Sequence, residues 1–376
     1  MSAITRSRPI VLAAGGTGGH VYPALALADV LGKRGWPIAF VTDERGTAFG
    51  DKQQGTEVHH IKAASLGGGA CSKLKGLTQL GVGLLQARAL LKRVQPAVAV
   101  GFGGYPSVPS MCAATQIGIP TVIHEQNAVL GRANRLLASR VGTIATSFNR
   151  VAGIQPQAAY KTVMTGNPVR HQISAIGEQP YPAPAPNDAF NLLVFGGSQG
   201  ARVLSDVVPA ALAKLTEEQR SRLHVTQQCR PEDLESVESV YARANITTVL
   251  KTYFDDMPDR LSETHLVVGR AGASTIAELM AARRPAILVP YLHAMDDHQT
   301  ANAAAIADTG ASWSIPEPSF TVELIAAKFT DFMNSPEKLA EAAANTDDHR
   351  RPDAADQLAD AVEAAANPVA EQGAAA

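Results

Sequence analysis

The sequence predicts an α/β protein built from two similar doubly wound domains, each around a parallel sheet. Short apolar segments rich in valine and isoleucine alternate with longer segments of helical periodicity, and parallel strands covered on both faces have such continuous apolar runs. A glycine-rich turn follows the first apolar segment of each half, in VLAAGGTGGH and LLVFGGSQGA. The length of 376 residues is also that of two ordinary domains.

The expected elements follow the chain in order. In the first half we expect strands within residues 9–16, 37–43, 96–104, 119–125 and 141–147, with helices that include 22–35 and 83–95. In the second half we expect strands within residues 190–200, 223–229, 246–254, 265–272 and 285–291, each followed by a helical segment. The carboxyl ends of the two sheets should meet at a shared cleft, because open α/β sheets bind ligands at that edge.

A proline-rich segment divides the two halves. Residues 176–189, IGEQPYPAPAPNDA, contain four prolines, which favour an extended connector. The sequence therefore predicts an N-terminal domain at 1–175, a linker at 176–189 and a C-terminal domain at 190–345. Residues 346–376 should form a terminal helix followed by a disordered tail.

Composition argues against a disordered, fibrous or membrane-spanning protein. Hydrophobic residues make up 45% and charged residues 18% of the chain, which is typical of a globular protein. The three cysteines, Cys71, Cys112 and Cys229, are scattered and read as reduced thiols of a cytosolic protein. No segment reaches the ~18 consecutive apolar residues of a membrane span. The N-terminal apolar run ends in a glycine turn, so we interpret it as a strand and not as a signal peptide.

Charge is distributed unevenly between the halves. Residues 1–170 hold 18 Lys and Arg against 6 Asp and Glu, a net charge of +12, whereas residues 171–376 hold 15 against 29, a net charge of −14. A chance surface bias is the plainer interpretation, but a difference of this size favours an anionic partner of the first half. That partner would be a membrane, a nucleic acid or a phosphorylated substrate.

The first glycine loop runs from Gly15 to His20. Its glycines and the following helix start suit a phosphate or an oxyanion, although a tight structural turn is an equal alternative. No Lys-Ser/Thr pair follows, so it is not a Walker A motif, and Val21 stands where a dinucleotide fingerprint needs its third glycine. Asp43 leaves a nicotinamide site as a weak alternative. The presence of His20 favours a functional loop over a purely structural turn. The positive end of a helix dipole favours the neutral, basic imidazole that a general base requires.

The second half has two comparable turns. The loop from Gly196 to Gly200 repeats the phosphate-binding pattern, and GRAGASTIAEL at 269–279 predicts a strand end, a turn and a helix start. A capping box would explain Ser274 or Thr275 together with Glu278 as structure alone. The alternative is that the helix start holds a diphosphate while Glu278 accepts the ribose hydroxyls. We interpret the pairs Asp255–Asp256 and Asp296–Asp297 as helix caps and not as metal ligands.

Seven motifs together resemble one family. They occur in order between about residues 9 and 345: GGTGGHVYPALALA, GFGGYPSVPS, HEQNAVLGRANRLLA, TGNPVR, FGGSQGA, GRAGASTIAEL and DDHQTANA. This set resembles the MurG family, bacterial N-acetylglucosaminyltransferases that convert lipid I to lipid II in peptidoglycan synthesis. The resemblance implies a GT-B fold of two Rossmann-like domains, UDP-GlcNAc as donor and lipid I as acceptor.

The resemblance also implies site residues. Substrate contacts are expected at Thr17, Gly18, Gly19, Asn127, Arg170, Ser198, Phe254, Ala273, Ser274, Thr275, Ile276, Ala277, Glu278 and Gln299. Within this set Arg170 and Ser198 would meet the diphosphate, Glu278 the ribose, and Asn127 and Gln299 the sugar. Phe254 would contact the uracil through its backbone. Residues 273–278 would hold phosphate, sugar and ribose, and Ser274, which replaces a leucine of some relatives, would make its contact through the backbone.

The expected reaction is an inverting displacement. His20 is the first candidate for the general base, followed by His124 and Glu125. Arg170 and backbone N–H groups could stabilise the leaving UDP without a metal ion, so we expect neither metal nor cofactor.

A membrane partner is expected at the first half. Leu77, Leu80, Leu84, Leu91 and Val94 recur at near-helical spacing beside Lys73, Lys75, Arg88, Lys92 and Arg93. The later part of this stretch should face the core, whereas LGGGACSKLKGL at 66–77 could form an exposed basic loop. The sequence thus predicts a peripheral enzyme on the cytoplasmic face of the inner membrane, with cell-wall and division proteins as possible partners.

Two other functions remain as alternatives. A UDP-GlcNAc 2-epimerase would share the architecture and the nucleotide sugar, but the basic first half and the HEQN motif argue against it. The other alternative is a nucleotide-sugar-binding or nucleic-acid-binding protein without catalysis. Single-strand binding is disfavoured, because aromatic residues are only 5% of the chain and none are interleaved with the basic segments of the first half.

Overall fold

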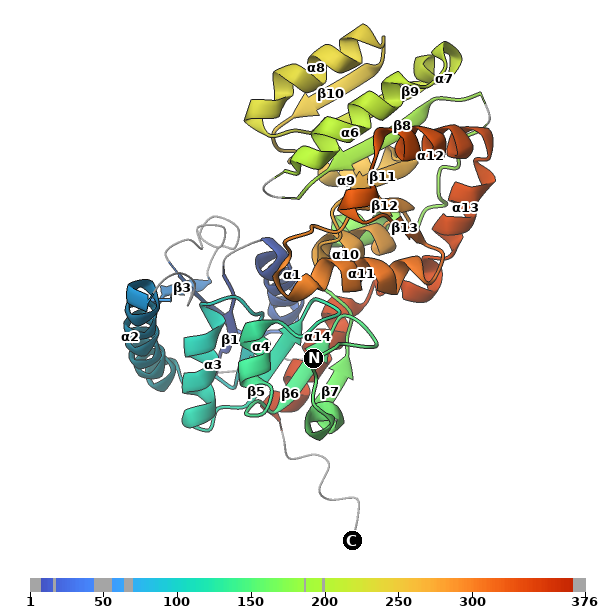
Figure 1. Cartoon of the computed structure of the whole chain (residues 1–376). Helices are drawn as coiled ribbons and strands as arrows, with labels where there is room; N and C mark the ends of the chain where they lie inside the picture. Colours follow the sequence, from blue (N-terminus) through green and yellow to red (C-terminus); the bar gives the residue numbers. More distant parts are fainter. Residues whose placement is uncertain are drawn as a thin grey trace. The chain divides into compact units, whose positions relative to one another are not determined.

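The chain folds into two compact units. The computed structural model describes residues 8–15, 18–43, 56–63, 70–185, 187–197 and 200–367. The first unit comprises Met1–Val169 and Asp353–Ala376, and the second comprises Arg170–Pro352. Each unit is an α/β domain with one parallel sheet, as Figure 1 shows, and the predicted fold class is confirmed.

The sheet of the first unit has the order β3-β2-β1-β4-β5-β6-β7, and all its described pairs are parallel. Its strands are β1 (Ile10–Ala13), β2 (Ile38–Thr42), β3 (Glu57–His60), β4 (Val98–Gly101), β5 (Thr121–Glu125), β6 (Thr143–Thr146) and β7 (Thr162–Met164). The strand order reverses direction between β1 and β4. In such sheets the crevice at the reversal point is the usual place for a ligand.

Both faces of this sheet are covered by helices. They are α1 (Gly18–Lys33), α2 (Ala70–Val94), α3 (Ser107–Gln116), α4 (Arg132–Leu137) and α14 (Ala354–Ala366). All four residues of β1 are buried, and they alternate between two clusters. Ile10 and Leu12 pack with residues of α1 and α14, whereas Val11 and Ala13 pack with residues of α2 and α3. Burial on both sides explains why this strand is a continuous apolar run.

The C-terminal helix α14 returns to the first unit and packs against α1. Arg34 joins it through three acidic residues, with contacts of 2.8 Å to Asp356, 2.6 Å to Asp360 and 2.8 Å to Glu363. This return lowers the charge asymmetry, because the first unit holds 17 Lys and Arg against 11 Asp and Glu, a net charge of +6. The predicted disordered tail, 368–376, lies outside the described residues.

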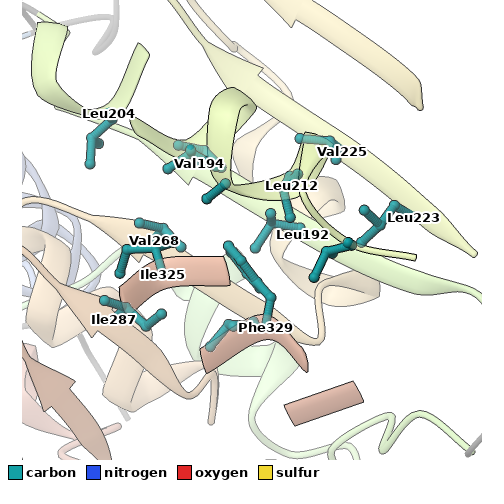
Figure 2. Close-up of a cluster of buried hydrophobic side chains, with 14 of the residues drawn as sticks. Leu192, Val194, Leu204, Leu212, Leu223, Val225, Val268, Ile287, Ile325 and Phe329 are labelled. Carbon is teal, nitrogen blue, oxygen red and sulfur yellow. The ribbon is translucent and has the colours of Figure 1, made fainter. Parts of the chain in front are cut away.

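The second unit has a sheet in the order β10-β9-β8-β11-β12-β13. Its strands are β8 (Phe190–Phe195), β9 (Leu223–Gln228), β10 (Thr247–Lys251), β11 (Leu266–Gly269), β12 (Ala286–Leu288) and β13 (Ser312–Ser314). Its helices are α5 (His171–Ile176), α6 (Arg202–Ala213), α7 (Glu217–Ser221), α8 (Leu234–Arg243), α9 (Met257–Glu263), α10 (Ala273–Ala281), α11 (His298–Ala307), α12 (Val322–Asn334) and α13 (Glu337–Ala344). Figure 2 shows its core, where Leu192 and Val194 of β8 meet Leu212 of α6 and Phe329 of α12.

The division between the units lies at Val169 and Arg170, ahead of the predicted linker. Helix α5 packs against α9 and α10 of the second unit. The hydroxyl of Tyr181, within the proline-rich segment, donates to the carbonyl oxygen of His265 at 2.6 Å. The described part of 176–189 therefore belongs to the second unit. Beyond Gln179 its described residues form neither helix nor strand, as their prolines favour.

Helix α2 differs in part from the expectation. Leu91 is buried and Leu84 packs against the same core, so the later part faces the sheet as predicted. Residues 70–77, however, are helical and do not form a loop, and residues 66–69 lie outside the described chain. Among the described helices, none is both long enough and apolar enough to span a membrane.

Candidate functional site

In the first unit, three loops at the carboxyl ends of neighbouring strands surround His20. Gly18, Gly19 and His20 are the first three residues of α1, which confirms the predicted helix start. Thr17 lies outside the described residues. The loop after β4 approaches the ring through Gly103 and Gly104, both with positive φ. A Cβ at Gly103 would lie 3.3 Å from Cε1 of His20, a tight contact, and the positive φ of both residues also favours glycine.

A chain of hydrogen bonds runs from His20 into the interior. Nδ1 of His20 is 3.1 Å from Oε1 of Gln126, and Nε2 of Gln126 is 3.0 Å from Nδ1 of His124. Nε2 of His124 is in turn 3.0 Å from the carbonyl oxygen of Gly166. His124 is fully buried, and burial lowers its pKa to about 4, so it is neutral at physiological pH.

Glu125 stabilises the turn after β5. Its Oε1 accepts from the backbone N–H of Asn127 at 3.0 Å and from Nδ2 of Asn127 at 3.2 Å. Its Oε2 accepts from the N–H of Gly131 at 2.8 Å and from Nδ2 of Asn134 at 2.9 Å. The carboxylate is only 1% exposed and holds four donors, so it is poorly placed to take a proton from a substrate. Among the three base candidates, the geometry favours His20.

In the second unit, Arg170 and Glu278 meet. Nη2 of Arg170 lies 3.0 Å from Oε1 of Glu278, although the two residues are 108 positions apart in the chain. Burial raises the pKa of Glu278, and the Arg170 guanidinium counteracts this rise. The structure thus brings together two residues for which the sequence predicted donor contacts.

The capping interpretation of GRAGASTIAEL is wrong. Helix α10 begins at Ala273 with Gly272 at the N-cap, and no side-chain cap bond is found there among the described residues. Glu278 is the sixth residue of the helix, too far along to cap it, and its carboxylate faces Arg170 instead. The first turn, from Ala273 to Thr275, therefore presents the backbone N–H groups and the positive dipole end that suit a phosphate. Ile276 is 2% exposed, so any contact it makes with a ligand is through its backbone.

Two further loops lie at the same edge of this sheet. In the loop after β8, Gly197 and Gly200 have positive φ, while Ser198 lies outside the described residues. A Cβ at Gly200 would be 3.0 Å from Cγ of Arg230, a basic residue that the sequence gave no reason to single out. In the loop after β12, the N–H of Tyr291 donates to Oε1 of Gln299, the second residue of α11, at 2.9 Å.

Other residues singled out from the sequence contact neighbouring residues of the protein itself. The Phe254 side chain is 4% exposed and lies under the Arg260 guanidinium at 5.1 Å, which leaves only its backbone for a ligand. Asp256 and Asp297 stand at the N-caps of α9 and α11, as predicted, but make no side-chain cap bond in the described structure. Asp256 pairs with Arg260 at 2.9 Å. In the described ranges, no three His, Cys, Asp or Glu side chains are grouped to hold a metal ion.

Comparison with known proteins places the fold and the motifs in one family. Residues 10–146 match the glycosyltransferase family 28 N-terminal domain, and residues 191–358 match the glycosyltransferase family 28 C-terminal domain. The chain is 52% identical to the UDP-N-acetylglucosamine--N-acetylmuramyl-(pentapeptide) pyrophosphoryl-undecaprenol N-acetylglucosamine transferase of Rhodospirillum centenum, over 95% of this chain and 94% of that protein.

Solved structures agree with this assignment. The MurG structure of Acinetobacter baumannii has a TM-score of 0.75 and 31% identity, and the match covers 94% of this chain and 99% of that chain. A UDP-GlcNAc 2-epimerase of Neisseria meningitidis, at a TM-score of 0.67 and 12% identity over 94% of this chain and 99% of that one, shares the fold alone. The chain belongs to glycosyltransferase family 28 and, within it, to the MurG family.

Proposed function

We propose that this protein is the inverting transferase that moves N-acetylglucosamine from UDP-GlcNAc to the lipid-linked N-acetylmuramyl-pentapeptide, lipid I, and so forms lipid II. The observation that carries the proposal is the 52% identity, over 95% of the chain, to a transferase of that name. The site geometry supports it, because both units gather glycine turns and helix starts at the carboxyl edges of their sheets.

The second unit supplies the donor contacts in this proposal. The helix start at Ala273–Thr275 and the guanidinium of Arg170 stabilise the negative charge that develops on the leaving UDP. Glu278 accepts hydrogen bonds from the ribose, while Ser198, Gln299 and the backbone at Phe254 complete the donor contacts.

The first unit supplies the base and, through Gly18, Gly19, Thr17 and Asn127, contacts to the sugars. As the acceptor hydroxyl oxygen bonds to the anomeric carbon, the bond from that carbon to UDP breaks and UDP leaves with the electron pair. His20 takes the hydroxyl proton. One base is sufficient, since no covalent enzyme intermediate is formed.

A transfer assay tests this function. Incubation with labelled UDP-GlcNAc and a short-chain lipid I analogue should move the label into a lipid-linked disaccharide. Label that appears in the 2-epimer of the nucleotide sugar, without need for the acceptor, would instead support an epimerase. No transfer to the lipid by the folded protein would contradict the proposal.

We also propose that α2 contacts the cytoplasmic face of the inner membrane. Val82 is 42% and Leu85 69% exposed on this helix, beside the exposed side chains of Arg88, Lys92 and Arg93. Apolar side chains flanked by basic ones suit an anionic lipid surface. The net charge of +6 on the first unit adds a general attraction.

Vesicle binding provides the measurement. We expect binding to anionic vesicles that is lost near 1 M salt, where the Debye length falls to about 3 Å. The double substitution Arg88→Glu and Lys92→Glu should weaken binding roughly 30-fold or more, since each basic residue contributes about 1 kcal/mol. Arg243→Glu, on an exposed helix end of the second unit, is the matched control and should have little effect. Equal binding to neutral and anionic vesicles would exclude an electrostatic surface.

A further inference from the structure

The orientation of the Gln126 amide is fixed by the backbone. Its Nε2 lies 3.0 Å from the carbonyl oxygen of Phe102 and 3.1 Å from that of His124. Carbonyl oxygens only accept hydrogen bonds, so the atom that faces them must be the amide nitrogen. Gln126 is 2% exposed, which leaves it no room to exchange these partners for water. Its oxygen therefore faces His20.

The tautomer of His124 follows in the same way. Its Nε2 faces the carbonyl oxygen of Gly166 at 3.0 Å and must donate a proton to it. Because burial keeps this ring neutral, with a pKa of about 4, Nδ1 has no proton and accepts from the amide nitrogen of Gln126. The ring of His124 and the carbonyls of Phe102 and His124 thus require the same orientation of the Gln126 amide.

This orientation determines the tautomer of His20. Oε1 of Gln126 can only accept, so Nδ1 of His20, 3.1 Å away, must carry the proton. In the neutral ring the lone pair then resides on Nε2, which becomes the basic nitrogen. The loop of Gly103 and Gly104 passes beside the ring, where an added Cβ would lie 3.3 Å from Cε1 and 3.4 Å from Cδ2.

We propose that Gln126, oriented by His124, is a positioning residue that holds His20 as the Nδ1–H tautomer and so directs its basic Nε2 to the acceptor hydroxyl. In the transfer step, His20 Nε2 gains the hydroxyl proton while Nδ1 keeps its own, and the resulting imidazolium still donates to Gln126. An amide accepts this bond without a negative charge, so it selects the tautomer but forms no ion pair with the imidazolium. The catalytic part of this inference rests on the proposed function.

Ring nitrogen NMR tests the tautomer independently of activity. In the full-length protein at a pH where His20 is neutral, ¹⁵N shifts should show a protonated Nδ1 and an unprotonated Nε2. Gln126→Met keeps the length of the side chain but cannot accept, so the His20 proton should redistribute toward Nε2. Turnover should fall roughly 10- to 100-fold, less than the loss expected for a missing base, while UDP affinity stays near that of the unchanged protein.

A matched variant separates positioning from general loss of packing. Gln227→Met changes another buried glutamine, whose Oε1 accepts from the Tyr241 hydroxyl at 2.6 Å in the second unit. It should lower the melting temperature without altering the His20 ring shifts. A protonated Nε2 in the unchanged protein, or an Nδ1–H tautomer that persists in Gln126→Met, would overturn the inference. If the unchanged protein showed the predicted tautomer but transferred no sugar, the proposed function would fail and the tautomer assignment would stand.

Discussion

Replacement of His20 by alanine should lower turnover by roughly 10²–10⁴-fold, the usual contribution of a general base, while UDP affinity stays nearly unchanged. His20 stands at the start of α1 in the first unit, whereas the proposed nucleotide contacts lie in the second. Its ring is only partly buried, so its loss should remove little packing and the fold should survive. Single-turnover rate, UDP affinity by calorimetry and melting temperature should be measured on the same sample.

A second histidine of the same sheet is the control. His60 is exposed at the carboxyl end of β3, with Nδ1 3.2 Å from the carbonyl oxygen of Asp43. His60→Ala should leave turnover unchanged. If His20 only shaped the glycine loop, His20→Ala would lower donor or acceptor affinity together with the turnover rate, and its melting temperature would fall. Near-normal turnover would overturn the assignment of His20 as the general base.

The sequence predicted the central strands because they are buried on both faces. β1, β4 and β5 consist entirely of buried residues, and each stands out as an apolar run between turns. The strands that the sequence did not predict, β3, β7 and β13, are edge strands of three or four residues. Edge strands are covered less completely, so their sequences, EVHH, TVM and SWS, lack the apolar run on which the prediction depended.

The packing of α14 against α1 of the first unit could not be predicted from local sequence either. It depends on packing of Leu358, Ala359 and Val362 in the core beside α1, and on contacts of Arg34 with three acidic residues more than 300 positions away. Neither kind of contact has a signal in the local sequence. The same limit applies to the site. The HEQN motif was recognised, but the proposed role of Gln126 depends on the carbonyls of Phe102 and His124, which the fold places around its amide nitrogen.

Replacement of Glu278 by alanine should weaken UDP binding by about 1.5–3 kcal/mol, roughly 10- to 150-fold, through loss of charge-assisted hydrogen bonds to the ribose. The carboxylate is suited to this because it is held at α10, 15% exposed, by Arg170 at 3.0 Å. Only Oε1 contacts Arg170 in the hydrogen bonds described, so a ribose diol could engage the carboxylate without complete loss of that ion pair.

Calorimetry with three samples distinguishes this role from a structural one. Glu323→Ala, which removes an exposed carboxylate 2.9 Å from Lys214 in the same unit, should leave UDP affinity unchanged.

Acidification of the unchanged protein should have the same effect on UDP affinity as Glu278→Ala. Burial raises the pKa of Glu278, so the carboxylate is protonated at a higher pH than an ordinary glutamate, and UDP affinity should fall as the pH drops through that raised pKa. Glu278→Ala should abolish this part of the pH dependence, since it has no carboxyl group to protonate. UDP affinity equal to that of the unchanged protein would show that Glu278 serves only to hold Arg170.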